Sequence, residues 1–307
     1  MSIEMSPQTD NNNNLLDKLG FTQDTIALII HCDDVGVCLD ANRGSFEAIE
    51  KGVATSGSIM MPCPWAYHAC QHAVDNPTLD LGIHLTLTCE WDYYKWGPIC
   101  DKADVPSLIK SDAFMPHKVH EVVAHANVAE VKKELVAQIE RALEFDLKPT
   151  HIDTHMATLF GTEALMEVYI DLGITYDLPL MTIEFNALNL AKIHSMIPSA
   201  EPMPDTLSQK LVQHGKPILD GFIGASFEPD YDKHYENYRK QILSLTPGVH
   251  QFVIHPMADS SEGRTVARTW EGRNNDRRFC LDPKTRDLIE EQGIKLINWR
   301  DIQAAMK

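Results

Sequence analysis

Short apolar runs alternate with amphipathic segments along this chain. The apolar runs predict strands at residues 25–32, 56–62, 79–88, 150–155, 218–222, 250–254 and 295–298. Apolar positions at helical spacing predict helices at residues 42–51, 66–74, 128–145, 163–172, 235–245 and 283–293. Because strands and helices alternate, the pattern is typical of a parallel sheet covered by helices.

The predicted strands and helices differ in how clearly the sequence marks them. The first strand reads TIALIIHC, a nearly continuous apolar run of the kind that is buried on both faces. The helix at 128–145 has the clearest periodicity, because Val131, Leu135, Ile139 and Leu143 recur at fourfold spacing.

The distribution of these elements predicts the domain organisation. The sequence contains no internal repeat and no linker-like segment, which favours a single α/β domain over residues 22–307, folded as a distorted (β/α) barrel similar to a TIM barrel. Residues 1–21 are polar and poor in apolar side chains, so we expect a disordered tail there. Segments 89–127 and 178–234 are less regular, and long loops in α/β proteins usually carry binding residues.

Composition and charge narrow the class of partner. At 307 residues, 44% of them apolar, the chain can bury a sizeable core. Its 27 basic and 44 acidic residues give a net charge of −17, which argues against nucleic acid or an anionic membrane as the partner. The sequence has neither a long apolar span nor a signal-like N-terminus, and its seven cysteines form no CxxC pair. We therefore expect a cytoplasmic protein with reduced thiols and a neutral or cationic small-molecule substrate.

Two adjacent carboxylates end the first predicted strand. His31, Cys32, Asp33 and Asp34 precede a turn at Gly36. Because the C-terminal ends of parallel strands form the ligand-binding face of a barrel, these acids are expected at that face, and the bend at a strand end lets both reach one site. The alternative is that Asp34 caps the next helix or that the pair solvates a turn.

Histidines mark three further strands. His84 interrupts an apolar strand, where a hydrogen-bonded core histidine is the alternative interpretation. His151, Asp153 and His155 recur at period two and so share one strand face, and His255 ends the apolar run QFVI. Burying such a row of ionisable groups is costly unless a metal or mutual pairing offsets the desolvation, although a polar surface strand would also explain it.

These strand ends together favour a catalytic metal site. Two imidazoles and one carboxylate form a three-ligand set that leaves positions open for water and substrate. Cys32 lies close enough in sequence to ligate, but a thiolate is not needed to complete the ligand set, and a core role is the preferred explanation. The ligand types favour zinc over magnesium, which prefers oxygen donors.

Four segments of the chain resemble those of the YdjC/ChbG-type carbohydrate deacetylases, which share catalytic logic with polysaccharide deacetylases. The segments are HCDDVGVCLDANRGSFEAIEKGVATSGSIM, DLGIHLTLT, KPTHIDTHMATLF and FVIHPM, and they occur in the family's order between about residues 26 and 300. The resemblance implies that Asp34, His84 and His155 bind one divalent metal ion, zinc or magnesium. It also implies that Asp33 is the catalytic base, that His255 is the general acid, and that the protein forms a homodimer.

The activity implied by the resemblance is metal-dependent removal of an N-acetyl group from an amino sugar or short oligosaccharide. The chain departs from the common family pattern at Met156, where a further histidine often follows the ligand, and in the Trp-rich loop after the third strand, so the sugar stays unassigned.

Several residues around these motifs have two possible roles. We expect His151 and Asp153 to orient a ligand, His155 in particular, or to bind substrate. Trp91 and Trp96 either stack on sugar rings or pack the loop.

Two rival functions remain compatible with the sequence. One is another metal-dependent amide or phosphoester hydrolase, and the other is a non-catalytic sugar- or metal-binding protein. Asp33 argues against simple binding, because holding a metal ion does not require it.

Overall fold

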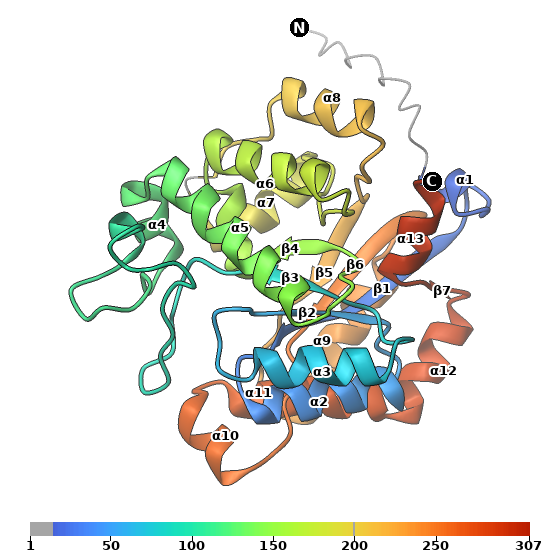
Figure 1. Ribbon diagram of the computed structural model, residues 1–307. Helices are drawn as coiled ribbons and strands as arrows, with labels where there is room; N and C mark the ends of the chain where they lie inside the picture. The colour runs from blue at the N-terminus through green and yellow to red at the C-terminus, as the bar shows by residue number, and fades with distance from the viewer. Residues whose placement is uncertain (1–14, 199) are drawn as a thin grey trace, which may run out of the picture.

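A parallel sheet lies at the centre of the computed structural model, which describes residues 15–198 and 200–307 (Figure 1). Its strands are β1 Ile26–Val35, β2 Ser56–Ile59, β3 Leu81–Leu85, β4 Ile152–Thr154, β5 Gly221–Gly224, β6 Gly248–Ile254 and β7 Lys295–Leu296. They are ordered β4-β3-β2-β1-β6-β5, β7 pairs with the beginning of β1, and the paired strands run parallel. The parallel sheet predicted from the sequence is thus confirmed.

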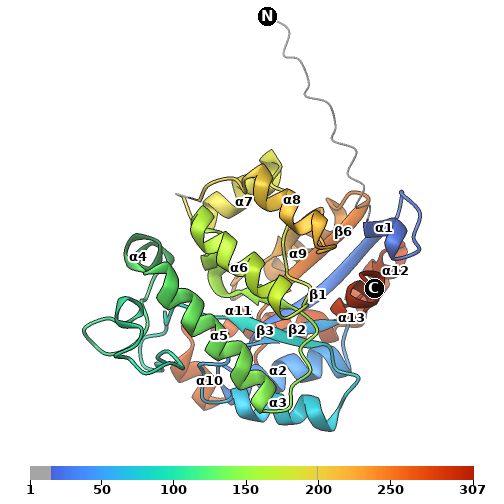
Figure 2. The same cartoon turned by 45° about the horizontal axis from the view of Figure 1, so that its top comes forward.

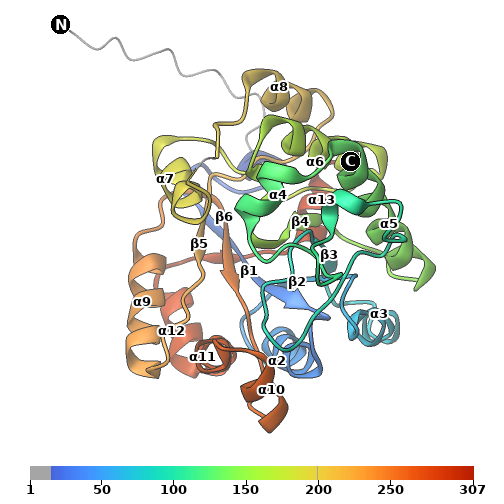
Figure 3. The same ribbon diagram turned by 90° about the vertical axis from the view of Figure 1, so that its left-hand side faces the viewer.

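Helices surround the sheet. The longer ones are α2 Leu39–Glu50, α3 Ala66–Asp75, α5 Val128–Glu144, α6 Glu163–Thr175, α7 Ala187–Met196, α8 Asp205–Gln213, α9 Tyr231–Leu243, α11 Trp270–Leu281 and α12 Pro283–Glu291. The shorter ones are α1 Leu15–Lys18, α4 Val119–His125, α10 Ser261–Val266 and α13 Trp299–Ala305, with 3₁₀ turns η1 Pro106–Leu108 and η2 His155–Phe160. Figure 3 shows the strands in the middle, with α2, α3, α5, α6, α7, α9 and α11 placed around them.

Two single bridges continue the sheet from β4 toward β5. Ile152 of β4 bridges to Leu180, and Ile183 bridges to Leu219 just before β5, both in parallel register. The chain at residues 180–183 therefore closes the curl of the sheet without forming a regular strand. This arrangement confirms the predicted distorted (β/α) barrel, whose distortion is concentrated at residues 180–183.

The core is built from the predicted apolar runs. Ala27 to Ile30 of β1 are fully buried, because β1 pairs with β2, β6 and β7 and is covered on both faces. In α5, Val131, Leu135 and Ile139 are buried as their spacing predicts, whereas Leu143 is 41% exposed and Ala142 is buried in its place. The apolar stripe thus rotates by one residue at the last turn, which fits the drift of a 3.6-residue helix against a fourfold spacing.

The structure corrects several predicted boundaries. Helices α4, α7 and α8 occupy segments expected to be irregular, and α10, α11 and α13 were not predicted. Helix α9 begins four residues earlier than predicted, because the Asp230 carboxylate caps it by accepting a hydrogen bond from Lys233 N at 3.0 Å.

Residues 15–21, which were expected to belong to a polar tail, pack against the core. Residues 1–14 lie outside the described residues, but Leu15 and Leu16 are buried against the core as part of α1, close to α13 and the C-terminus (Figure 2). Two adjacent leucines supply the apolar area that a polar tail lacks. In the described part of the chain, no helix has both the length and the apolar character needed to cross a membrane.

Candidate metal centre and active site

A cavity of about 540 Å³ opens at the C-terminal ends of the strands. Five of the predicted ionisable site residues line it together with Trp91, namely Asp33, Asp34, Asp153, His155 and His255. They come from β1, β4, the beginning of η2 and the end of β6, which the parallel sheet brings to one edge. The predicted clusters therefore meet in one place.

A bulge in β1 explains how two consecutive carboxylates reach the same cavity. The register between β1 and β2 shifts between Cys32 and Val35, and Asp34 takes a left-handed backbone conformation with φ of 62°. Consecutive residues of a regular strand point to opposite faces, and a bulge with a left-handed residue removes that alternation. Both Asp33 and Asp34 consequently line the cavity.

Asp34, His84 and His155 form a compact group of possible ligands. Asp34 Oδ1 lies 3.4 Å from His84 Nε2 and 3.1 Å from His155 Nδ1, and the two histidine nitrogens are 3.2 Å apart. Ligand atoms at zinc-bond lengths of about 2.0–2.1 Å in a tetrahedron lie about 3.3 Å from one another. Asp34 Oδ1 is buried and makes no hydrogen bond with the described residues. A buried carboxylate oxygen without a hydrogen-bond donor, and three ligand atoms separated by these distances, fit a bound metal ion.

Asp153 orients His84. Its Oδ1 accepts a hydrogen bond from His84 Nδ1 at 2.7 Å, and its Oδ2 accepts one from Ser58 at 2.8 Å. The contact follows from register, because His84 of β3 and Asp153 of β4 are directly paired. The bond places the proton on Nδ1 and leaves Nε2 free to face Asp34. Asp153 was expected to orient His155, and the structure places it on the other histidine.

Glu90 holds His155 in the corresponding way. His155 Nε2 donates to Glu90 Oε2 at 3.1 Å, so that Nδ1 is the nitrogen that faces Asp34. After His155 the backbone turns sharply, because Met156 and Ala157 both have positive φ, of 52° and 55°. Such consecutive left-handed residues are strained, and strain of this kind often lies beside functional sites.

Arg273 of α11 balances the charge on Asp34. Its Nη1 donates to Asp34 Oδ2 at 2.8 Å, and its guanidinium lies over the rings of Trp91 and Phe227 at 5.3 and 5.5 Å. Burial by itself raises the pKa of Asp34, but Arg273 and His155 outweigh it and hold that pKa well below its usual value. Asp34 is therefore ionised, as a ligand must be.

The carboxylates also set the protonation of the two histidines in the metal-free site. Burial alone lowers the pKa of His84, yet Asp153 and Asp33 raise it well above its usual value. Burial likewise opposes the charged form of His155, and Glu90 with Asp34 raises its pKa to about 9. Without a metal ion, these carboxylates therefore favour the protonated forms of both imidazoles, so a cation competes with protons for the site.

The predicted base and acid lie at different strand ends of the same cavity. Asp33 Oδ1 accepts a hydrogen bond from His31 Nδ1 at 2.7 Å, and Asp33 Oδ2 is 3.7 Å from His84 Nε2. His255 packs against Phe227, and its Nδ1 is buried without a hydrogen-bond partner among the described residues. Burial lowers the pKa of His255 below its usual value.

Two of the other expected residues take different roles. Trp91 lines the cavity, whereas Trp96 is only 3% exposed, does not line it, and donates its indole N–H to Thr88 O at 2.8 Å. Trp96 therefore packs within the loop, which is one of the two roles expected for it. His151 is fully buried and contacts His31, not a ligand or the cavity.

Sequence reasoning missed the partners of the ligands. Glu90 follows the strand that carries His84, so its position in the loop was a usable signal. Arg273 lies in a polar segment with no strand or helix periodicity, 239 residues from Asp34, and no sequence signal connected the two. His31 was part of the first cluster but was given no role.

Comparisons with known proteins identify the relatives of this chain. A family model described as YdjC-like protein matches residues 27–291. A carbohydrate deacetylase from Clostridium beijerinckii is 30% identical over 277 residues, covering 90% of this chain and 99% of the relative. One from Geobacillus stearothermophilus is 40% identical over 127 residues, which cover 41% of this chain and 48% of that relative.

A solved structure shares the fold. The crystal structure of a candidate cellobiose-phosphate cleavage protein from Enterococcus faecalis superimposes with a TM-score of 0.72 at 23% identity. The match covers 91% of this chain and 99% of the other.

Proposed function

The chain belongs to the YdjC-like family, and on that basis we propose that it is a metal-dependent carbohydrate deacetylase, which hydrolyses the N-acetyl group of an amino sugar or short oligosaccharide. The observation that carries the proposal is the group of Asp34, His84 and His155, with Asp33 beside it and His255 on the same cavity. Binding a metal ion requires only the first three residues. The additional acid and base favour a catalyst.

We propose that Asp34 Oδ1, His84 Nε2 and His155 Nδ1 bind one divalent cation. Two imidazoles and one carboxylate favour zinc over magnesium. When bound, such a cation polarises the amide carbonyl and makes a neighbouring water more acidic. The remaining chemistry belongs to the side chains.

Asp33 is proposed to take the proton of the attacking water. Its carboxylate lies on the cavity and is held by the His31 N–H, so one oxygen is fixed and the other stays available. Removing a proton from the nucleophile as it attacks is general-base catalysis, which contributes typically about 10²–10⁴-fold to a rate.

His255 is proposed to protonate the leaving amine. An amine is a poor leaving group unless its nitrogen gains a proton as the carbon–nitrogen bond breaks. The lowered pKa of His255 makes its protonated form a stronger acid toward that nitrogen. His255 lines the cavity, where its ring can approach a substrate group.

The charge of the cavity disfavours a phosphoester substrate. The carboxylates that line it are Asp33, Asp34, Glu90, Asp92 and Asp153. The two arginines on it are already paired, Arg273 with Asp34 and Arg268 with Asp92. A dianionic phosphate would meet net negative potential there, whereas an N-acetyl sugar is neutral. These carboxylates support amide hydrolysis over the rival phosphoesterase reading.

Acetate release tests the proposal. Purified protein is stripped of metal, reloaded with zinc or magnesium, and incubated with N-acetylated chito-oligosaccharides of increasing length. We expect release that is abolished by chelator and restored by metal. Release that is insensitive to chelator, or no release from any of the N-acetyl sugars after reloading, would refute the proposal.

Variants separate the base from the ligands. Asp33→Asn should keep one metal ion per chain and lose at least 10²-fold in kcat, as expected for a general base. Asp34→Asn should lose the metal ion itself. Asp220→Asn is the matched control, because that carboxylate accepts Val249 N–H at the opposite end of the sheet. Full activity of Asp33→Asn would show that another group is the base.

A cytoplasmic location and a homodimer are proposed from the sequence and the family resemblance only. Light scattering of the purified protein tests the dimer directly.

A further inference from the structure

A line of buried side chains runs from Asp33 through the barrel interior to the opposite end of the sheet. Asp33 Oδ1 contacts His31 Nδ1 at 2.7 Å, and His31 Nε2 contacts His151 Nε2 at 2.8 Å. His151 Nδ1 lies 2.9 Å from Thr150 Oγ1, which lies 2.8 Å from Asp80 Oδ1. Each of the four side chains behind Asp33 belongs to a residue at most 2% exposed. The line is unbroken and shielded from water.

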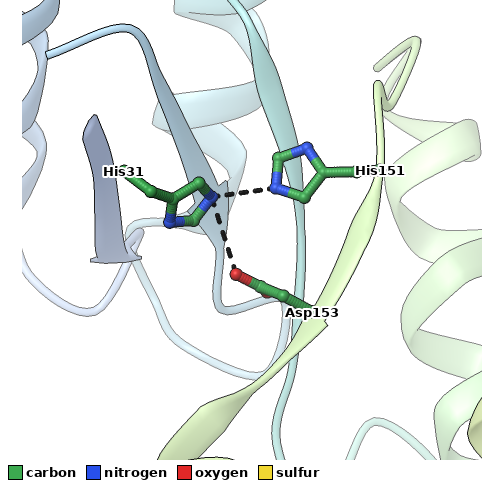
Figure 4. Close-up of side chains that lie close together, drawn as sticks. All are labelled: His31, His151 and Asp153. Carbon is green, nitrogen blue, oxygen red and sulfur yellow. Dashed lines mark hydrogen bonds and ion pairs between the residues drawn. The ribbon is translucent and has the colours of Figure 1, made fainter. Parts of the chain in front are cut away.

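Small residues in the middle strands make this contact possible. Strands β1 and β4 are separated in the sheet by β2 and β3, so His31 and His151 meet only because the sheet curls (Figure 4). The His151 ring covers Gly82 of β3, where a Cβ would lie 2.5 Å from His151 Cε1. On its other side, the ring stacks on Trp299 at 4.8 Å. The ring of His151 is therefore fixed by packing as well as by hydrogen bonds.

The number of available hydrogen-bond donors shows which atom carries the proton between His31 and Asp33. An ionised carboxylate only accepts, so His31 Nδ1 carries the proton of that bond. The rest of the line can be satisfied in two ways. In the first, Thr150 donates to Asp80 and His31 donates to His151. In the second, Asp80 is protonated, Thr150 donates to His151, and His151 donates to His31. Both arrangements hold the same number of protons and keep the His31 N–H on Asp33.

The surroundings agree with either arrangement. Burial lowers the pKa of His151 well below its usual value, and His151 is neutral in both. Asp80 also accepts hydrogen bonds from Ser56 Oγ at 2.7 Å and Arg300 N at 2.7 Å, so it is anchored independently of the line. Among the described residues, His31 pairs with the carboxylates of Asp33 and Asp153, and Asp153 Oδ2 is 3.6 Å from His31 Nε2.

We propose that His31 is a positioning residue for the base Asp33, and that His151, Thr150 and Asp80 act on Asp33 through it by holding the His31 ring in place. This rests on the proposed function, since it gives the line a role in turnover. Only His31 touches Asp33. Thr150 and Asp80 lie at the end of the sheet away from the cavity, so any effect of theirs on the reaction must travel along the line.

A second metal ion is the competing explanation for the same cluster. His31, His151 and Asp153 offer ligand atoms within 4.8 Å of one another. The spacing is uneven, however, because the two nitrogens are 2.8 Å apart and the carboxylate oxygen is 3.6 Å from His31. A tetrahedral ion would need edges of about 3.3 Å, as the group around Asp34 has. A direct nitrogen–nitrogen hydrogen bond explains 2.8 Å without an ion.

Thr150→Val is the decisive variant, because it removes one hydroxyl and keeps the size of the side chain. We expect kcat to fall by about tenfold, with KM within twofold of the wild type and one metal ion per chain retained. Thr150→Ser restores the hydroxyl and should restore kcat. A purely structural role would lower the yield of folded protein and leave the kcat of the folded fraction unchanged.

A double-mutant cycle tests whether the effect passes through His31. His31→Gln should lower kcat, and adding Thr150→Val to it should produce no further loss, because the line is already interrupted. Independent, additive losses would overturn the proposal. So would two metal ions per chain in the wild type, with one lost in His151→Gln.

A substrate-free measurement separates this proposal from the deacetylase assignment. The proton of His31 Nδ1 bonded to a carboxylate should give a downfield resonance that disappears in His31→Gln, shifts in Thr150→Val and returns in Thr150→Ser. This pattern supports the line even if no N-acetyl sugar is hydrolysed. If Thr150→Val leaves the resonance unchanged, the line does not hold His31, whatever the substrate is.

Discussion

The orientation of His84 by Asp153 is the contact whose removal should weaken metal binding without removing a ligand. In Asp153→Asn the side chain keeps an oxygen that accepts from His84 Nδ1, where the present distance is 2.7 Å, but loses its charge. A hydrogen bond to a charged group contributes about 1.5–3 kcal/mol and a neutral one about 0.5–1.5 kcal/mol. The substitution therefore costs about 1–1.5 kcal/mol at this bond, which corresponds to roughly tenfold in affinity.

Proton competition changes this effect with pH. The Asp153 carboxylate is the leading cause that raises the pKa of His84 against the opposing effect of burial. In the variant His84 is less strongly protonated, so the metal ion displaces its proton more easily, and this offsets part of the loss near neutrality. We expect binding at pH 7 to be weaker by less than tenfold. The loss should grow to about tenfold at alkaline pH, where neither protein holds the proton, which is the lower end of the 10–100-fold range typical of residues that orient a ligand.

Competition with a chromophoric zinc chelator at several pH values measures the affinity. Asp40→Asn is the matched control, since Asp40 is a buried carboxylate that accepts from Gly263 N at 3.0 Å and contacts no proposed ligand. Its affinity should equal that of the wild type. If Asp153→Asn binds zinc as tightly as the wild type at every pH, the orienting role of Asp153 is wrong.

Three further predictions follow from individual contacts. Gly82→Ala should lower the free energy of unfolding, measured by urea titration, by about 1–3 kcal/mol. The reason is that the new Cβ would lie 2.6 Å from the backbone oxygen of His151 and also against the His151 ring. A change below about 0.5 kcal/mol would contradict this packing. Arg273→Met leaves the Asp34 carboxylate buried without its cation. The free energy of unfolding of the metal-free protein should therefore fall by about 3–5 kcal/mol, and zinc should restore much of this stability. Equal losses with and without zinc would count against the pairing. Glu90 and Asp34 raise the pKa of His155 to about 9 without metal, and Asp153 and Asp33 raise that of His84 as well, so protons must leave both imidazoles before the ion binds. The affinity should therefore rise by more than tenfold per pH unit just above pH 7; calorimetry in buffers of different ionisation enthalpy detects the released protons, and a pH-independent affinity would refute this.

Most of the strand framework could be predicted from the sequence, because apolar runs and their spacing report local burial. Residues 27–32 of the first apolar run are fully buried in β1, and the helix at 128–145 is nearly the observed α5. Prediction fails where the buried residues of an element are polar and so form no periodic apolar pattern. Helix α11 buries Arg273, Asn275 and Asp276, polar residues whose burial depends on distant partners, so no apolar stripe marked it.

The sequence by itself determined that Asp33, Asp34, His155 and His255 would lie near one another. Parallel strands place their C-terminal ends at one edge, so residues at strand ends are brought together by any fold of this class. The same reasoning allowed two adjacent aspartates to share a site, since a strand end bends, and the bulge at Asp34 supplies that bend.

Only the tertiary structure decided which atoms face inward and what holds them. The pairing of His84 with Asp153 depends on the β3–β4 register, that of His155 with Glu90 on the path of a loop, and the contact of His31 on the curl of the barrel. Register, loop path and curvature are set by packing between segments far apart in the chain. Such packing leaves no periodic signal in the sequence, so the residues that orient the site could not be read from it.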